Sequence, residues 1–332
     1  MLENDGVSEK ISGISCWLEL GGKTKKMIED EFIEPQKNLN KNDIFAFLAR
    51  KFIGTQCFYE TSLDAIPNDQ MRVRITSFDC VTFIYFVLAL SGVKTFSEFV
   101  EKLYKIRYIA NDEKLINNDP MNGNFYDFVC ESLILNSSNR NYLKNITANT
   151  VDETILKKFS VKLQGFHRKS QYDQQNTYIT PKYGERDFSD YFIPSEEVYK
   201  INYDAVLSGD IVLFTRGGHF SNGEKTTCLI YHLAIIIKEN GKLCLLHATR
   251  NYYLKPEATK GNPHKISTGY YYLDDPKNEQ IGVGFSVRPA GDEHTITVNS
   301  EKIYCYLPDE RFELKDYAMA YFKGVSIWRS IV

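Results

Sequence analysis

One cysteine and two histidines are the residues whose types and positions could carry out covalent catalysis. Cys80 stands at the start of an apolar run, SFDCVTFIYFVLAL at 77–90, which predicts a buried helix. Asp79 fits the N-cap and Gly92 the left-handed position after the last turn. Cys80 would lie in the first turn, where the helix dipole lowers the pKa of a thiol and makes it nucleophilic. The alternative is that Cys80 is only a small buried apolar residue.

A predicted β-hairpin brings the two histidines together. The turn sequence ENGK at 239–242 joins two strand-like stretches, 229–237 and 243–249. A two-residue turn places His232 diagonally across from His247, about 7–8 Å away at the backbone. We expect this face to point into the core and also to carry Ile230, Ala234 and Ile236.

Two imidazoles on one face suit a catalytic base held by an orienting partner. One ring accepts the thiol proton and the other fixes the tautomer of the first. A helix that starts at Cys80 and packs against this face would complete a nucleophile, a base and an orienting group. Zinc is the competing interpretation. Cys228 lies about 13 Å along the strand from His232, and Cys244 faces away from His247, so a tetrahedral metal site is difficult to assemble.

The elements that must position these residues follow an α+β order, with helices first and strands later. Helices are expected at about 38–53, 96–106, 125–135 and 314–322, with Thr95 capping the second. Strands are expected at 211–215, 229–237, 243–249, 295–298, 303–307 and 324–328. The GGKT sequence at 21–24 is interpreted as a turn. Residues 1–42 are weakly patterned and are taken as an extension before one catalytic domain, 43–332, with divergent insertions at about 136–195 and 255–295.

Composition excludes several classes of protein. The 332 residues are 43% apolar and 25% charged, as in ordinary globular proteins. The net charge of −3, without a basic block, gives no indication of a nucleic-acid partner. Seven cysteines at irregular spacing, without a C-x-x-C, form no disulfide framework or zinc ribbon. The polar start MLENDGVSEK indicates no signal peptide, and no membrane span is found. We expect a cytoplasmic protein, or one delivered by a route without a cleavable signal.

Several motifs resemble the N-acetylmuramoyl-L-alanine amidase-like branch of the NlpC superfamily of papain-like cell-wall hydrolases. The most specific is Phe78-Asp79-Cys80-Val81-Thr82-Phe83, followed by Ala89-Leu90. The others, in family order over roughly 43–329, are Phe52-Ile53-Gly54-Thr55, Ile106-Arg107-Tyr108, Leu207–Phe214 with Gly209-Asp210, Tyr231-His232, Leu246-His247-Ala248-Thr249 and Tyr317…Gly324-Val325…Arg329.

The resemblance implies a papain-like, NlpC-type α+β core in which the cysteine helix packs on an antiparallel sheet or small barrel. It implies Cys80 as nucleophile, His232 as general base and His247 as the third, orienting member. The substrate-binding residues that it suggests are Tyr59, Asp79, Arg107, Tyr108 and Tyr231. The implied reaction is hydrolysis of the amide between N-acetylmuramic acid and L-alanine in bacterial peptidoglycan or muropeptides, with no cofactor and no metal. It would serve in recycling or in an exported effector against a cell wall.

The sequence also departs from the family pattern, which leaves other substrates open. The region 121–128 lacks the arginine or histidine and the tryptophan usual after the Arg107-Tyr108 motif. One alternative is a papain-like peptidase, deamidase or acyltransferase that acts on a host or prey protein. Another is a catalytically silent module that binds glycopeptides. The intact set of Cys80, His232 and His247 argues against a silent module.

Overall fold

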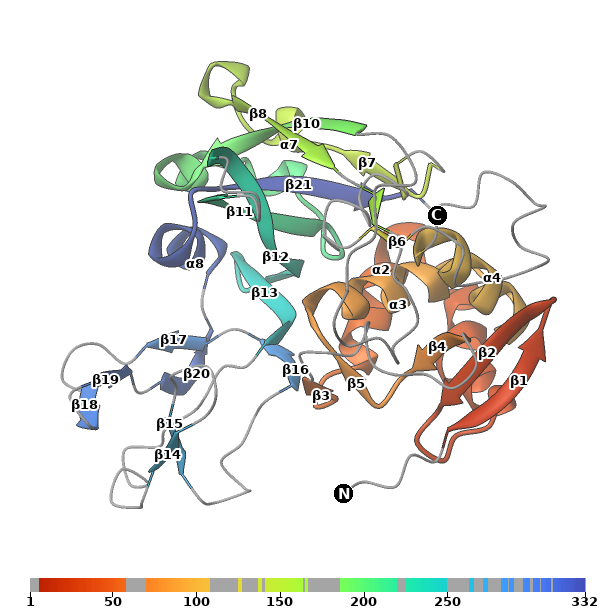
Figure 1. Ribbon diagram of the computed structural model, residues 1–332. Coiled ribbons are helices and arrows are strands. Elements are labelled where there is room, and N and C mark those ends of the chain that lie inside the picture. The colour runs from red at the N-terminus through yellow and green to blue at the C-terminus, as the bar shows by residue number, and fades with distance from the viewer. Residues whose placement is uncertain are drawn as a thin grey trace.

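The computed structural model describes residues 6–57, 70–107, 125–126, 137–138, 141–163, 165–166, 186–219, 225–249, 263–265, 271–273, 282–285, 287–289, 295–298, 301–304, 306–311 and 313–331. A long, mostly antiparallel sheet lies between two groups of helices (Figure 1). The expected mixed α+β class is therefore confirmed.

The main sheet has ten strands. Its order is β5 (Ser77–Phe78), β3 (Gln56–Cys57), β16 (Gly282–Phe285), β13 (Lys242–Thr249), β12 (Lys225–Glu239), β11 (Ile211–His219), β21 (Gly324–Ser330), β10 (Arg186–Pro194) and β8 (Lys157–Leu163), and β7 (Leu143–Asn145) also pairs with β21. All pairs are antiparallel except β3 with β5. The three strands expected near 211–215, 229–237 and 243–249 are the three consecutive strands β11, β12 and β13 at its centre.

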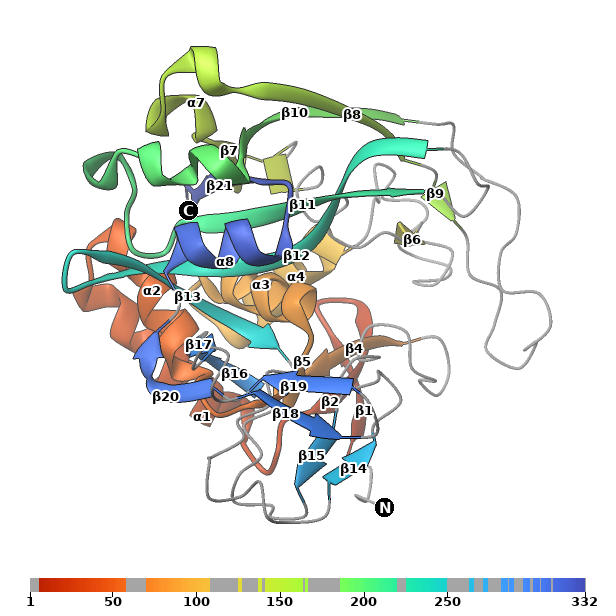
Figure 2. The same ribbon diagram turned by 90° about the vertical axis from the view of Figure 1, so that its left-hand side faces the viewer.

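Two cores lie on opposite faces of this sheet because side chains alternate along each strand. The first core lies under α2 (Lys41–Lys51), α3 (Cys80–Leu90) and α4 (Phe96–Arg107). The second core lies under α8 (Leu314–Tyr321). In β13, for example, Leu246 points into the first core and Leu245 into the second. Figure 2 looks at the sheet from the side of α8, with α3 and α4 behind it.

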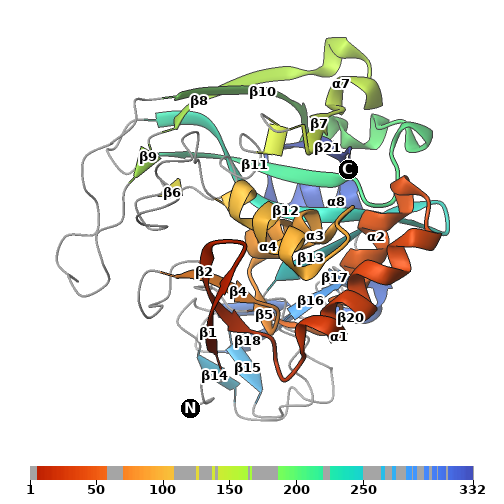
Figure 3. The ribbon, with the colours of Figure 1, turned by 90° about the vertical axis from the view of Figure 1, so that its right-hand side faces the viewer.

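The first described strands join the first core. The strands β1 (Val7–Ile11) and β2 (Ile14–Glu19) form a hairpin, and β2 pairs in parallel with β4 (Met71–Arg74). Helical segments α1 (Lys25–Ile28), η1 (Glu29–Ile33) and η2 (Glu34–Asn38) follow. Figure 3 shows this small sheet beneath α3 and α4. The division into an extension and one catalytic domain stays a prediction.

The remaining described elements are short. They are β6 (Phe125–Tyr126), α7 (Thr147–Thr150), η4 (Glu153–Ile155), β9 (Gly165–Phe166), η5 (Ser195–Lys200), η6 (Tyr203–Ala205), β14 (Pro263–Lys265), β15 (Tyr271–Leu273), β17 (Val287–Pro289), β18 (Thr295–Val298), β19 (Glu301–Tyr304) and β20 (Tyr306–Arg311). The helix expected at 125–135 is wrong at its start, because β6 pairs as a strand with β9; residues 127–135 lie outside the described part. The strand expected at 303–307 is divided between β19 and β20. None of the described helices has the length and apolar character needed to span a membrane.

Candidate active site

The N-terminus of α3 is fixed by a capping box. The Asp79 carboxylate accepts hydrogen bonds from the backbone N–H groups of Val81 at 2.9 Å and Thr82 at 2.7 Å. In return, the Thr82 hydroxyl accepts the Asp79 N–H at 2.8 Å. Gly92, after the last turn, has the left-handed φ of 71° that was predicted. Cys80 is the first residue of this helix and is half-buried.

The C-terminus of α3 is held from two other segments. The buried amide of Gln36 donates to the Leu90 carbonyl at 2.9 Å and accepts the Gly92 N–H at 2.9 Å. The ammonium of Lys102, on α4, donates to the Ser91 carbonyl at 2.6 Å. Burial lowers the pKa of Lys102 to about 7. Both ends of the helix that carries Cys80 are therefore fixed by side chains.

The hairpin register is as predicted. The pairing of β12 with β13 runs from Glu239 and Lys242 at the turn to Ile235 and Leu246. The two turn residues have positive φ angles of 49° and 74°, which the right-handed strand twist favours in a two-residue turn. This register, read from the sequence, determines where the two histidines lie.

His232 and His247 form a hydrogen-bonded pair. The Nε2 atom of His232 lies 2.6 Å from the Nδ1 atom of His247, and the ring centroids are 4.9 Å apart. His247 is fully buried. Three aromatic rings of the second core surround the pair. Phe214 and Phe322 stack on His232 with centroids 6.0 and 6.4 Å away, and Tyr317 meets His247 edge-to-face at 5.5 Å.

Burial keeps both imidazoles neutral. It lowers the pKa of His232 to about 4, and it lowers that of His247 well below 6.5, an effect that the neighbouring His232 reinforces. Within the described part of the chain, no cluster of side chains could hold a metal ion. In a neutral pair, one ring donates the shared proton and the other accepts it. Among the described residues, the buried Nε2 of His247 has no hydrogen-bond partner.

The face on which the pair lies differs in part from the expectation. Ile230 packs in the first core, whereas the histidine pair lies in the second. The reason is a β-bulge in β12: His232 is opposite Phe214 and Ile230 is opposite Thr215, so Tyr231 is an extra residue. An extra residue reverses the alternation of side chains that follows it. The expectation that Ile230 shares the face of the histidines is wrong.

The same two strands separate the histidine pair from the body of α3. The helix packs against β12 and β13 from the side of the first core, and Cys80 packs at the edge of that core. The pairing of these strands ends at Ile235 and Leu246, so His232 and His247 both lie beyond the last paired residues. The structure thus brings His232 and His247 together, but α3 packs on the other face of the strands that carry them. The expectation that the Cys80 helix packs against the histidine face is wrong, because this helix covers the face that carries Leu233, Ile235 and Leu246.

The other predicted site residues have varied positions. Asp79 caps α3, as described above. Arg107, at the end of α4, is buried and donates to the Arg72 carbonyl at 2.7 Å. Tyr231 is the extra residue of the bulge, and its side chain lies outside the described part. Tyr59 and Tyr108 also lie outside the described residues.

Sequence reasoning did not identify two sets of contacts between segments that are remote in the sequence. Tyr317, in α8, and Phe322, the residue after this helix, pack on the histidines. The sequence pattern predicted the helix but not this contact. The Arg329 guanidinium forms two hydrogen bonds of 2.7 Å with the carboxylate of Asp210, which is buried at the start of β11. Asp210 and Arg329 both belong to motifs noticed in the sequence, but no local pattern predicts that they form a pair.

Comparison with known proteins gives the family. Residues 47–255 match the family model described as AmiA-like, N-acetylmuramoyl-L-alanine amidase-like. A crystal structure of a Legionella pneumophila protein is 16% identical, with a TM-score of 0.57 over 93% of this chain and 94% of that one. A crystal structure of an N-acetylmuramoyl-L-alanine amidase from Bacteroides uniformis is 14% identical, with a TM-score of 0.50 over 88% and 99%.

At these identities the two structures are evidence of fold alone. No curated protein matches the chain. The family match covers more than half of the chain and includes Cys80, His232 and His247. The chain belongs to the AmiA-like, N-acetylmuramoyl-L-alanine amidase-like family.

Proposed function

We propose that this chain is a cysteine amidase that hydrolyses the N-acetylmuramoyl-L-alanine bond of peptidoglycan or muropeptides. The observation that carries the proposal is the neutral histidine pair, with nitrogens 2.6 Å apart, on the strands against which the Cys80 helix packs. The family to which the chain belongs supports the substrate class. The proposal includes a papain-like, NlpC-type core, with Cys80 as nucleophile, His232 as base and His247 as orienting partner.

The proposed first step uses the nitrogen of His232 that His247 leaves available. Because Nε2 of His232 contacts His247, Nδ1 accepts the proton of the Cys80 thiol. The sulfur attacks the lactyl carbonyl carbon, and the Cys80 backbone N–H stabilises the oxyanion. His232 returns the proton to the alanine nitrogen as the C–N bond breaks. The peptide leaves with a free amino group, and the acyl group remains as a thioester on Cys80.

The second step restores the enzyme. His232 accepts a proton from water while the water oxygen attacks the thioester carbonyl. The C–S bond breaks, the sulfur regains the proton from His232, and the muramic acid leaves as a carboxylic acid. One water is consumed and one amide bond is cleaved.

This mechanism requires one tautomer of the histidine pair. His232 can accept a proton at Nδ1 only if its Nε2 carries the hydrogen and donates it to His247. His247 then carries its own hydrogen on the buried Nε2, beside the ring of Tyr317. The low pKa of His232 keeps Nδ1 unprotonated at neutral pH.

The proposal also requires the thiol to meet His232 across the strands. We propose that the two side chains make contact beyond Ile235 and Leu246, where the pairing of β12 with β13 ends. Cys80 is half-buried at the first residue of its helix, the end from which a side chain can reach past a strand edge.

Mass spectrometry of muropeptides incubated with the wild type and with Cys80→Ala tests the proposal. We expect the wild type alone to release stem peptides that begin with L-alanine. Cys244→Ala is the matched control, because Cys244 is buried and burial raises its pKa, so this variant should remain active. Release by Cys80→Ala at the wild-type rate would contradict the assignment of the nucleophile.

Two other results would redirect the proposal. Cleavage within the stem peptide would keep Cys80 as nucleophile but make the enzyme an endopeptidase. If no muropeptide is cleaved while iodoacetamide still alkylates Cys80 faster than Cys16 and Cys244, the substrate would be sought among host or prey proteins, as for a peptidase, deamidase or acyltransferase. The biological role, in recycling or as an exported effector, stays a prediction.

A further inference from the structure

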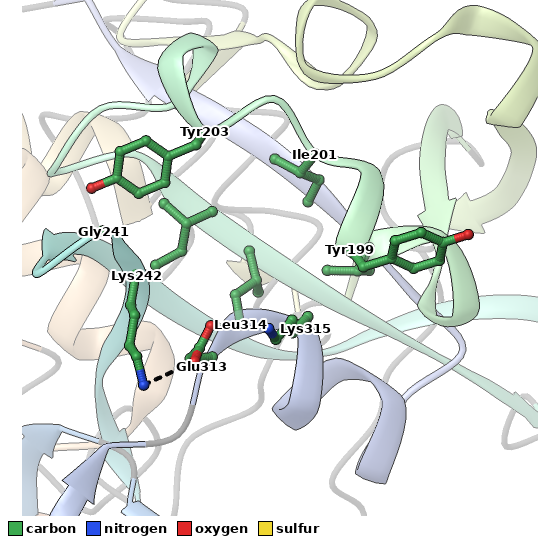
Figure 4. Close-up of a pocket in the computed structure, with 10 residues that line it drawn as sticks. Tyr199, Ile201, Tyr203, Gly241, Lys242, Glu313, Leu314 and Lys315 are labelled. Carbon is green, nitrogen blue, oxygen red and sulfur yellow. Dashed lines mark ion pairs between the residues drawn. The ribbon is translucent and has the colours of Figure 1, made fainter.

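A pocket of about 100 Å³ opens beside the turn of the β12–β13 hairpin, where α8 begins (Figure 4). Its apolar lining is formed by Val198, Ile201, Leu243 and Leu314. Figure 4 shows Tyr203 and Tyr199 on opposite sides of the pocket and Lys242 beside Glu313. The pocket therefore combines an apolar surface with charged groups at one side.

The charged groups of the pocket favour an anionic ligand. The Glu313 carboxylate lies 3.1 Å from the Lys242 ammonium and 3.4 Å from the Lys315 ammonium. These two cations and one anion leave a positive charge among the lining residues. Both lysines are about half exposed, at 53% and 46% of their side-chain surface, and exposed ion pairs contribute little stability. A lysine can therefore exchange Glu313 for an incoming carboxylate at small cost.

We propose that this pocket binds the free carboxylate end of a peptide. The carboxylate would contact Lys242 and Lys315, and the adjacent small apolar side chain would lie on Leu243 and Leu314. An uncharged sugar would use the tyrosines but would gain nothing from the two ammonium groups. The surplus positive charge thus favours a peptide terminus over a neutral glycan.

The position of the pocket connects it with the histidine pair. The helix α8 begins at the pocket with Leu314 and Lys315, and Phe322 is the residue that follows its last turn. Met319 is 58% exposed, and the Phe322 ring stacks on His232. The eight residues of α8 span about 12 Å, roughly the length of three to four extended peptide residues. If the proposed function is correct, the bound peptide is the stem peptide, its amino end at His232 and its carboxylate in the pocket.

Binding of acetyl-alanyl-alanine to the full chain with Cys80→Ala, measured by calorimetry and ligand-observed NMR, tests the site without requiring catalysis. We expect the Lys242→Met/Lys315→Met variant to bind about 5–10-fold more weakly, since methionine keeps the apolar stem but removes the charge. Glu313→Gln should bind about 2–5-fold more tightly because the lysines lose their competing carboxylate. The C-terminal amide of the same dipeptide should bind more weakly than the acid.

Lys26→Met is the matched control, because Lys26 is an exposed lysine in an ion pair with Asp30, far from the pocket in the sequence and on α1. It should bind like the Cys80→Ala parent. Equal binding of the acid and the amide would overturn the proposal, and so would weaker binding by Glu313→Gln. A merely structural role for Glu313 would weaken binding rather than strengthen it.

Kinetics separate this proposal from the proposed function. With muropeptides that end in a free carboxylate, Lys242→Met/Lys315→Met should raise KM and leave kcat unchanged, and amidated muropeptides should show no such difference. Dipeptide binding as expected without any amidase activity would support the pocket and overturn the proposed function. Amidase activity without dipeptide binding would overturn the pocket and leave the proposed function standing.

Discussion

At the scale of single residues, burial decides the charges of the groups that could do chemistry. His232 and His247 lie among aromatic rings and become harder to protonate, because charge is costly in such surroundings. Asp190, buried on β10, responds in the opposite direction. Burial raises its pKa to about 6, although hydrogen bonds such as that from the Tyr191 N–H partly oppose the shift. Each shift therefore favours the neutral form of the group relative to its ordinary pKa.

These pKa shifts make the free energy of unfolding depend on pH. An unfolded histidine has a pKa of about 6.5, so between pH 6.5 and pH 4 the unfolded chain binds the proton that folded His232 rejects. Stability from His232 is complete above pH 6.5 and is lost as the pH falls toward 4. The loss at pH 5 amounts to about 2 kcal/mol. Asp190 offsets about 1 kcal/mol of this loss of stability, because its carboxylate is protonated more readily in the folded chain than in the unfolded chain.

We predict that His232→Gln flattens this pH dependence. Urea unfolding of the wild type and of the variant at pH 7.5 and pH 5.0 measures the effect. The variant should lose about 2 kcal/mol less than the wild type over this interval, whatever its stability at pH 7.5. Asp190 is present in both proteins, so its contribution cancels in the comparison. Equal losses in the two proteins would show that folding does not keep the His232 ring neutral.

At the scale of elements, α3 is the helix whose position matters most for the site. Its capping box satisfies N–H groups at the end where Cys80 lies, and Gln36 and Lys102 bind carbonyls at its other end. A long apolar helix without such contacts could slide or fray at its ends, because apolar packing has little direction. The caps therefore determine where the thiol lies relative to β12 and β13.

We predict that Asp79→Ala lowers stability by about 1 kcal/mol, the usual cost of a lost N-cap, and lowers amidase kcat at least about 10-fold. The first turn of α3 would fray and the thiol would lose its fixed position. Asp152→Ala is the control. Asp152 caps the short helix η4 through the Thr154 N–H at 2.9 Å, is exposed, and is remote from α3 in the sequence. This variant should keep kcat unchanged. A similar loss of kcat in both variants would contradict the positioning role of the cap.

At the scale of the whole molecule, one ion pair connects the last strand of the chain with its neighbour β11, which is remote in the sequence. Arg329, in the last strand, binds Asp210 at the start of β11 and also the Ala205 carbonyl at 2.9 Å. The same carboxylate accepts the Leu207 N–H at 2.7 Å. Asp210 is 2% exposed, so its charge depends on these partners. By contrast, Arg50 and Glu239 form an exposed pair between α2 and the hairpin.

We predict that Arg329→Met destabilises the protein by about 2–4 kcal/mol, because the buried carboxylate of Asp210 loses its cation. Arg50→Met, at the exposed pair, should cost less than about 1 kcal/mol. Chemical denaturation of both variants and of Asp210→Asn/Arg329→Met measures the difference. The double variant should be more stable than Arg329→Met alone. Equal costs for the two arginines would mean that Asp210 is hydrated despite its burial.

The sequence alone determined the features that depend on neighbouring residues. The N-cap at Asp79, the apolar helix after Cys80 and the left-handed Gly92 follow from local backbone preferences. The hairpin register, and with it the pairing of His232 with His247, follows from a two-residue turn and the period of two along strands. The N-terminal strands β1 and β2 were not expected, because short strands joined by a tight turn leave only a weak pattern.

Only the tertiary structure decided which face of the sheet each side chain occupies. A bulge at Tyr231 reverses the alternation, and nothing in the local pattern reveals a bulge that depends on the register with β11. The contacts of Tyr317 and Phe322 with the histidines, and of Arg329 with Asp210, join segments that are remote in the sequence. Such contacts depend on how the chain crosses the sheet, and that path is set by the packing of two cores rather than by any local preference.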